Sequence, residues 1–355
     1  MDAYILLEDG TVFKGKAFGA NKTVFGEIVF NTSMSGYQEI LTDPSYAGQI
    51  VVMTYPLIGN YGVNKEDVES NKIQVRGFVV KEYSKHDSNW KSEENLSDYL
   101  KKEGIFAISN VDTRMLTKKI RNQGTMNCVL TTEKIDDNIK KQLKEYSFPK
   151  NIVSNVSIKD IKNIKGKGKH IGIIDLGLKK GIEKQLKNLG CSLTIFPWDT
   201  SYEKILSYNL DAVLFSNGPG DPKDVKVAIN TAEKLIGKIP LFGICLGHQI
   251  LALALGGDTY KMKFGHRGGN HPVLDLRTNK IMITAQNHGY AVKDSITKEI
   301  EITHININDS TVEGFCNKGL NINAVQFHPE AGPGPNDASI ILKHWVDLVE
   351  EGDNA

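Results

Sequence analysis

From residue 170 onwards, short apolar segments alternate with amphipathic ones, and this alternation constrains the fold more than any other feature of the sequence. The apolar runs have the length and composition of strands: 170–175, 191–196, 211–216 and 239–244. Helical patterns follow them: 179–188, 202–208, 224–237 and 246–255. Such alternation indicates a parallel sheet covered by helices on both faces. We therefore predict an α/β fold with a mostly parallel sheet here, and a functional site at the carboxyl ends of its strands.

Residues 1–150 have a different pattern, in which strand-like runs come first and helical ones later. The runs 4–7 and 11–14 flank Asp9-Gly10, a dipeptide typical of hairpin turns. We predict an α+β N-terminal domain over 1–150. The polar, lysine-rich stretch 151–168 is a poor core former and is predicted to be a flexible linker, followed by a second domain over 169–355.

The composition restricts the classes of function. With 355 residues, 40% hydrophobic and 24% charged, the chain is long and apolar enough for two folded domains. Its 43 basic residues are balanced by 42 acidic ones, so a broad attraction to nucleic acid or membrane is excluded. The N-terminus does not resemble a secretory signal, and the cysteines have no C-x-x-C spacing. We expect a cytoplasmic protein with free thiols.

Cys245 stands where a predicted strand meets a predicted helix. Gly243 and Gly247 flank it in the pattern G-x-C-x-G, the thiol form of the nucleophile elbow. Glycine is needed in so sharp a turn because a Cβ would collide with the neighbouring strand or helix. The start of the following helix favours a thiolate and offers N–H groups to an oxyanion. As an ordinary buried cysteine, Cys245 would leave the two glycines without a purpose, so we predict an exposed, activated nucleophile.

A polar triplet, His328-Pro329-Glu330, follows the apolar run 322–327, which reads as a buried strand. In an extended chain residues two apart point to the same side. Glu330 can therefore orient the imidazole of His328, whose other nitrogen would take the thiol proton. A His-x-Glu motif has little specificity by itself, and the cysteine elbow is what makes this pair a candidate.

Three other histidines lie in conspicuous glycine-containing segments, namely His266, His271 and His288. None has metal-ligand spacing to a cysteine or a carboxylate, so we predict no metal site. For His266 and His271, a structural role in a loop and a contact with substrate remain equally open.

Together these motifs resemble a known family. The sequence Gly-Ile-Cys-Leu-Gly-His-Gln at 243–249, with His328-Pro329-Glu330, resembles the triad-type (class I) glutamine amidotransferases. Three further segments look like the small subunit of carbamoyl phosphate synthetase: 216–222, 263–271 and 284–290. Residues 30–45 resemble that subunit's own first domain, which other amidotransferases lack. The resemblance implies a carbamoyl phosphate synthetase small-subunit N-terminal domain and a flavodoxin-like class I amidotransferase domain after it.

The resemblance also implies a set of site residues. Cys245, His328 and Glu330 would form the catalytic triad. Contacts with glutamine would come from loops and from the elbow: Ser45, Gly218, Gly220, Leu246, Gln249, Asn287, Gly289 and Tyr290. The N–H of Leu246, with one from the loop 218–220, would hold the oxyanion. The family often has phenylalanine where this chain has Tyr290, a change that a backbone contact would survive.

The implied activity is hydrolysis of glutamine to glutamate and ammonia through a cysteine thioester. Ammonia would pass to a large subunit that makes carbamoyl phosphate from ATP and bicarbonate, for arginine or pyrimidine synthesis. This chain has neither a G-x-x-x-x-G-K-[ST] nor a G-x-G-x-x-G motif. We therefore expect no cofactor on it, with ATP and a divalent metal on the large subunit, in a heterodimer or a higher oligomer.

Two rival hypotheses about function each predict a feature that the sequence can be checked for. A free-standing hydrolase or cysteine peptidase on the same fold would need no additional N-terminal domain, and the match in 30–45 counts against it. A non-catalytic regulatory subunit would be expected to lack one of the three catalytic residues, all of which are intact.

Overall fold

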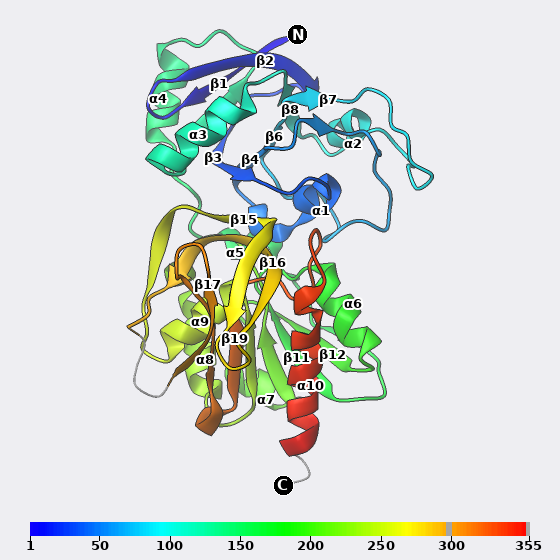
Figure 1. Cartoon of the computed structure of the whole chain (residues 1–355), viewed down its shortest axis with the longest axis vertical. Helices are drawn as coiled ribbons and strands as arrows, with labels where there is room; N and C mark the ends of the chain where they lie inside the picture. The colour runs from blue at the N-terminus through cyan, green and yellow to red at the C-terminus, as the bar shows by residue number, and fades with distance from the viewer. Residues whose placement is uncertain (296–299, 353–355) are drawn as a thin grey trace. The chain divides into compact units, whose positions relative to one another are not determined.

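The computed structural model describes residues 1–295 and 300–352 of the chain. The chain divides into two compact units, Met1–Pro149 and Lys150–Ala355 (Figure 1).

The first unit, all of whose residues are described, is a closed barrel with helices packed around it. In order around the barrel, the strands are β1 (Asp2–Leu7), β2 (Val12–Gly19), β8 (Phe106–Ser109), β6 (Gly77–Val79), β4 (Gln49–Met53), β3 (Val24–Asn31) and β9 (Met126–Thr131). The helices are α1 (Tyr37–Thr42), η1 (Pro44–Tyr46), α2 (Leu96–Lys102), α3 (Thr113–Gln123) and α4 (Asp137–Glu145). A small parallel pair, β5 (Leu57–Ile58) and β7 (Glu82–Tyr83), completes the unit.

The predicted hairpin at Asp9-Gly10 is present, because β1 and β2 pair antiparallel with Leu6 opposite Val12. The barrel itself was not predicted. Its closure depends on parallel pairing of β3 with β4, β4 with β6 and β6 with β8. These pairings join segments that are far apart in the chain, and local periodicity carries no information about such partners.

The described residues of the second unit form a 10-stranded sheet. Its parallel part consists of β11 (His170–Asp175), β12 (Ser192–Pro197), β13 (Ala212–Phe215), β14 (Leu241–Ile244) and β19 (Ile322–Val325). They lie in the order β12-β11-β13-β14-β19, which is the 2-1-3-4-5 order of flavodoxin-like sheets. This order makes β14 and β19 direct neighbours, so their carboxyl ends meet at the same edge.

Helices cover both faces of this sheet, as predicted. One core contains α8 (Lys226–Leu235) and α9 (Leu246–Ala254), with Val213 and Phe215 of β13 beneath them. The other contains α6 (Lys180–Asn188) and α10 (Ile340–Gly352), with Ala212 and Leu214 beneath. Alternate residues of β13 therefore face opposite layers, and this explains why the strand is apolar throughout. A short helix, α7 (Tyr202–Leu206), follows β12.

The sheet is less parallel than expected. Beyond β19 the strands pair antiparallel: β18 (Val312–Asn317), β16 (Lys280–Val292), β15 (Thr259–Asp275) and β17 (Glu301–Asn306). The two longest, β15 and β16, are joined by a short turn with Asp275 opposite Lys280. A short connection can only join antiparallel strands, because a parallel pair needs a crossover of a dozen residues or more.

The predicted linker, 151–168, has regular structure. It contains α5 (Ile152–Val156), whose Val153 is buried in a core of the second unit. It also contains β10 (Lys162–Ile164), which forms one edge of the sheet and pairs antiparallel with β12. Lysine-rich composition suggested a flexible connector, but an edge strand tolerates such residues because one of its sides faces solvent.

None of the described helices is both long and apolar enough to cross a membrane.

Candidate active site

Cys245 occupies the turn between β14 and α9. Its backbone has φ 54° and ψ −104°, a strained combination for an L-amino acid, as expected of a nucleophile elbow. A Cβ on Gly247 would lie 2.0 Å from the carbonyl oxygen of Phe215, and one on Gly243 would lie 2.7 Å from the carbonyl carbon of Gly247. Both glycines are therefore required by close backbone packing.

The nucleophile is buried, not exposed as we predicted. Cys245 is 2% exposed, and its Sγ lies 3.6 Å from the carbonyl oxygen of Asn287, which belongs to β16. The elbow does place the thiol at the end of the sheet, but β16 covers it. Sequence alone could not reveal this cover, because the antiparallel extension of the sheet was not predicted.

His328 and Glu330 lie side by side at the carboxyl end of β19, the strand next to β14. Nδ1 of His328 is 2.6 Å from Oε1 of Glu330, and both side chains are buried. The extended geometry that we assumed is wrong in detail. β19 ends at Val325, and the two side chains meet across a turn in which the N–H of Ala331 donates to the carbonyl oxygen of His328 at 3.1 Å.

Sequence reasoning missed a fourth polar residue, Lys179. Its Nζ lies 3.0 Å from Oε1 of Glu330 and 2.5 Å from the carbonyl oxygen of Ala331. The side chain is 2% exposed, so this ion pair is buried. Its position shortly after the carboxyl end of β11 is the signal that could have found it, since that end faces the site.

The charges of these groups depend on one another. Burial opposes a positive charge on His328. The nearby Glu330 carboxylate and the hydrogen bond with Cys245 favour that charge and outweigh the effect of burial, so the pKa of His328 is raised. Burial likewise opposes the charge of Glu330, but Lys179 and His328 together lower the pKa of that carboxyl. Because Nδ1 of His328 is engaged by Glu330, Nε2 is the nitrogen that remains for the thiol. The arrangement can move a proton from sulfur to the imidazole of His328, and Glu330 stabilises the imidazolium that forms.

Most residues expected to contact glutamine gather around this triad. Leu246 begins α9 immediately after the nucleophile, and Gln249 follows one turn later. Nε2 of Gln249 donates to the carbonyl oxygen of Tyr290 and to Oε1 of Gln326, both at 2.9 Å. Asn287, Gly289 and Tyr290 lie on one stretch of β16.

The loop 218–220 follows β13 and also lies at the carboxyl edge. A Cβ on Gly218 would be 2.2 Å from the carbonyl oxygen of Leu176, and Gly220 has φ 93°, so both positions require glycine. Ser45 belongs to the first unit, in η1, where its N–H donates to Oδ1 of Asp43 at 2.8 Å.

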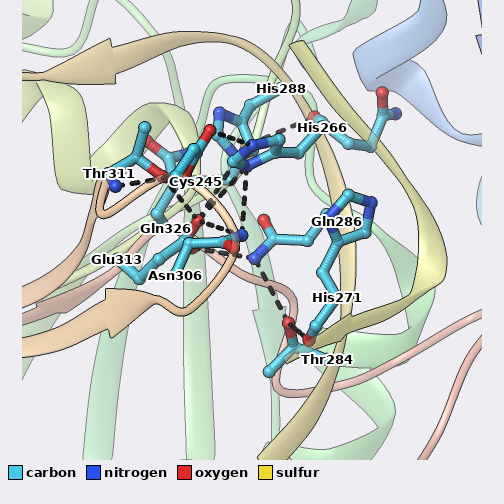
Figure 2. A network of polar contacts seen from close by, with 12 residues as sticks. Cys245, His266, His271, Thr284, Gln286, His288, Asn306, Thr311, Glu313 and Gln326 are labelled. Atoms are coloured by element: carbon cyan, nitrogen blue, oxygen red, sulfur yellow. Dashed lines mark hydrogen bonds and ion pairs between the residues drawn. The ribbon is translucent and has the colours of Figure 1, made fainter. Parts of the chain in front are cut away.

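A buried polar network lies on β15, β16 and β18, close to the nucleophile (Figure 2). It includes His266, His288 and Glu313, whose nitrogen and oxygen atoms lie within 4.8 Å of one another. We predicted no metal-ligand constellation, because Glu313 is remote from both histidines in the sequence. Only the pairing of the strands brings the three together.

The fold and the site define a class of protein. A cysteine on a strand–helix elbow faces an oriented histidine from the adjacent parallel strand, and the model of the family "Glutamine amidotransferase class-I" matches residues 172–348. The second unit is therefore a class-I glutamine amidotransferase domain. In the first unit, the model "Carbamoyl-phosphate synthase small chain, CPSase domain" matches residues 5–130.

Relatives match over almost the whole chain. The carbamoyl phosphate synthase small chain of Clostridium acetobutylicum is 51% identical over 98% of this chain and 100% of that relative. The small chain of Caldanaerobacter subterraneus subsp. tengcongensis is 53% identical over 98% of this chain and 97% of its own length. The pyrimidine-specific small chain of Bacillus subtilis is 48% identical, over 99% and 96%. This chain belongs to the family of carbamoyl phosphate synthase small chains.

Proposed function

We propose that this chain hydrolyses glutamine through a thioester on Cys245 and delivers the ammonia to a large chain that makes carbamoyl phosphate. As a member of its family, it is the glutaminase small subunit of a carbamoyl phosphate synthase. The proposed domain boundaries are 1–150 for the N-terminal domain and 169–355 for the amidotransferase domain. The two chains act as a heterodimer or a higher oligomer in the cytoplasm.

In the proposed reaction, the Cys245 thiolate attacks the side-chain amide carbon of glutamine. The oxyanion is held by the N–H of Leu246 and one from the loop 218–220, where preorganised donors stabilise developing charge. His328, held by Glu330, protonates the departing ammonia. It then activates the water that releases glutamate from the thioester.

The substrate is held by groups around the triad, as we infer from their placement. Gln249, Asn287, Gly289 and Tyr290 contact the amino-acid end of glutamine. Buried polar groups of this kind reject a substrate that cannot pair with them. ATP, bicarbonate and the divalent metal are bound by the large chain, and this chain carries no cofactor for the reaction.

The observation that best supports the proposal is the geometry of the Cys245–His328–Glu330 site. A buried His–Glu pair at 2.6 Å beside a strained cysteine has a clear use in activating a thiol. A regulatory subunit without catalysis would have no need of it.

The first prediction concerns Cys245→Ser. This variant should lose more than about 10³-fold in glutamine hydrolysis, because the weaker nucleophile cannot form the thioester. Synthesis of carbamoyl phosphate from added ammonia, measured with the large chain, ATP and bicarbonate, should stay within about twofold of wild type, since that chemistry is remote from the thiol. Cys191→Ser, at another buried cysteine, is the matched control and should keep glutamine hydrolysis.

The same assay tests the partner. Glutamate release should be slow for the chain alone and should rise when the large chain and its substrates are added. Rapid release that is indifferent to the large chain would instead indicate a free-standing hydrolase, and glutamine-dependent synthesis by Cys245→Ser would exclude the proposed nucleophile.

A further inference from the structure

A second constellation of buried polar side chains, none of them members of the triad, lies on the antiparallel part of the sheet. His266 of β15 and His288 of β16 are directly opposite each other in the strand pairing, with their ring centroids 5.0 Å apart. Glu313 of β18 lies against both, with Oε1 at 3.3 Å from Nδ1 of His266 and 3.9 Å from Nε2 of His288. The two histidines are 5% exposed and Glu313 is 0% exposed.

Both imidazoles are held by their outer nitrogens. Nδ1 of His288 lies 2.7 Å from the carbonyl oxygen of Tyr290, which can only accept, so this nitrogen carries the proton. Nε2 of His288 then has a free lone pair, and it makes no hydrogen bond to any described residue. Nε2 of His266 lies 2.9 Å from Oδ2 of Asp309, which leaves Nδ1 directed at Glu313. Histidines that bind metals are typically oriented in this way, by a carboxylate or a backbone carbonyl behind the ring.

The distances between the inner atoms suit a small cation. Tetrahedral Zn²⁺ with bonds of about 2.0–2.1 Å holds its ligand atoms roughly 3.3 Å apart. Oε1 of Glu313 lies 3.3 Å from Nδ1 of His266 and 3.9 Å from Nε2 of His288. One ligand atom from each of the three residues lies within 4.8 Å of the other two. A side-chain movement of about 1 Å would close the set around an ion of that size.

We propose that His266, His288 and Glu313 form a binding site for a divalent transition-metal ion of the Zn²⁺ type, with Asp309 and the Tyr290 carbonyl as supports behind the rings. Two imidazoles and one carboxylate are a ligand set that zinc uses in proteins, with water in the fourth position. The ion adds the positive charge that a fully buried carboxylate needs.

The competing arrangement is a protonated His266 between two carboxylates. Burial opposes charge on His266, but the hydrogen bonds to Asp309 and Glu313 outweigh it and raise the pKa of His266 to about 9. When the ion binds, it takes the Nδ1 lone pair of His266, and the proton on that nitrogen passes to solvent. The two states differ only in which cation lies beside Glu313, so a direct measurement of bound metal separates them.

The location gives the site a structural consequence. His288 lies within the segment 287–290 that we assign to glutamine binding, next to Asn287, whose carbonyl oxygen contacts the Cys245 thiol. An ion bound by His288, His266 and Glu313 would link β16 to β15 and β18 next to that segment. Figure 2 shows Cys245 close to this network.

The test uses the full-length chain carrying Cys245→Ser, so that a metal held by the catalytic thiol is excluded. Protein purified without chelator or metal-affinity tag is analysed for zinc by mass spectrometry, then depleted and titrated with Co²⁺. We expect about one ion per chain and visible Co²⁺ bands of a tetrahedral site, without a thiolate charge-transfer band in the near ultraviolet. Zinc should raise the unfolding temperature of the depleted chain.

Four further variants make the assignment specific. Glu313→Gln and His288→Gln should abolish the Co²⁺ bands and the rise in unfolding temperature. Asp309→Asn replaces a partly exposed carboxylate behind the ring of His266, so it should destabilise the fold less than the other two substitutions. It should weaken the affinity for the metal ion about 10–100-fold. His304→Asn removes another buried histidine of the same sheet and should leave binding unchanged. The proposal is wrong if neither zinc nor cobalt binds, or if Glu313→Gln binds as well as its parent.

Discussion

At the scale of single residues, the backbone of Cys245 is strained. With φ 54° and ψ −104° it lies in a region that only glycine enters freely, and such strain costs on the order of 1–3 kcal/mol. The close contacts around Gly243 and Gly247 hold the turn in this conformation. The thiol is positioned at the expense of stability, as is common at catalytic sites.

This strain predicts an inverted order of stability. Cys245→Gly should be more stable than Cys245→Ala by about 1 kcal/mol, because glycine relieves the strain and alanine does not. At an unstrained site glycine would be the less stable of the two by roughly 0.5–1 kcal/mol. Denaturant unfolding of both variants measures the difference. If Cys245→Ala were the more stable, the elbow would not be strained.

The His328–Glu330 pair predicts a particular dependence of stability on pH. Because the folded-state pKa of His328 is raised, its contribution is fully present below the unfolded value of about 6.5 and is lost as pH rises towards the folded value. Because the pKa of Glu330 is lowered, its contribution is present above about 4.3 and is lost as pH falls.

We therefore expect wild type to lose stability from about pH 6.5 upwards relative to Glu330→Gln, with a slope of at most about 1.4 kcal/mol per pH unit. The measurement is the free energy of unfolding of wild type and of Glu330→Gln from pH 5 to 9. Subtracting one from the other removes the contributions of titrating groups that the two proteins share. A difference that is constant over this range would contradict the proposed charge of His328.

At the scale of elements, the strand–helix junction depends on how closely α9 approaches β13. The missing side chain of Gly247 allows its backbone to lie against Phe215, and the N–H of Gly247 donates to the carbonyl oxygen of Ser216 at 3.0 Å. Because β13 and β14 are paired, this contact aligns the start of α9 with the edge of the sheet. The glycines thus position an element as well as shape a turn.

Gly247→Ala should destabilise the chain by about 3 kcal/mol and reduce glutamine hydrolysis, since the new Cβ would meet a backbone carbonyl that cannot move alone. Gly319→Ala is the matched control, because its Cβ would have no neighbour closer than 3.6 Å. That variant should stay within about 0.5 kcal/mol of wild type. Equal effects of the two substitutions in thermal unfolding would refute the proposed contact.

At the scale of the whole molecule, each unit has its own buried core. Leu100 of α2 is buried with the barrel strands, and Leu251 of α9 is buried on the sheet of the second unit. Units with separate cores unfold as separate cooperative blocks unless their interface is large and apolar.

We expect calorimetry to resolve two transitions, with a calorimetric enthalpy greater than the van't Hoff enthalpy. Leu100→Ala should lower one transition and Leu251→Ala the other, each by roughly 5–15 °C, because truncating a buried leucine costs about 2–5 kcal/mol. A single transition that both substitutions lower equally would show that the two units unfold together.

The sequence by itself determined the local features of this protein. Alternating apolar and amphipathic segments define the strands and helices of the second unit, and the spacing of Gly243, Cys245 and Gly247 defines the elbow. His328 and Glu330 were found because they are close in sequence and follow an apolar strand. Each of these patterns reflects the geometry of a few consecutive residues, so it can be read without knowing what lies across from it.

The tertiary structure alone decided the features that join distant segments. Closure of the barrel, the antiparallel extension that covers Cys245, and the ordered structure of 151–168 all depend on strand pairing. Lys179 reaches Glu330 across 151 positions of the chain, and Glu313 meets His266 and His288 from a third strand. Such contacts arise when the whole chain buries its apolar surface, and the energy that selects them is spread over many residues.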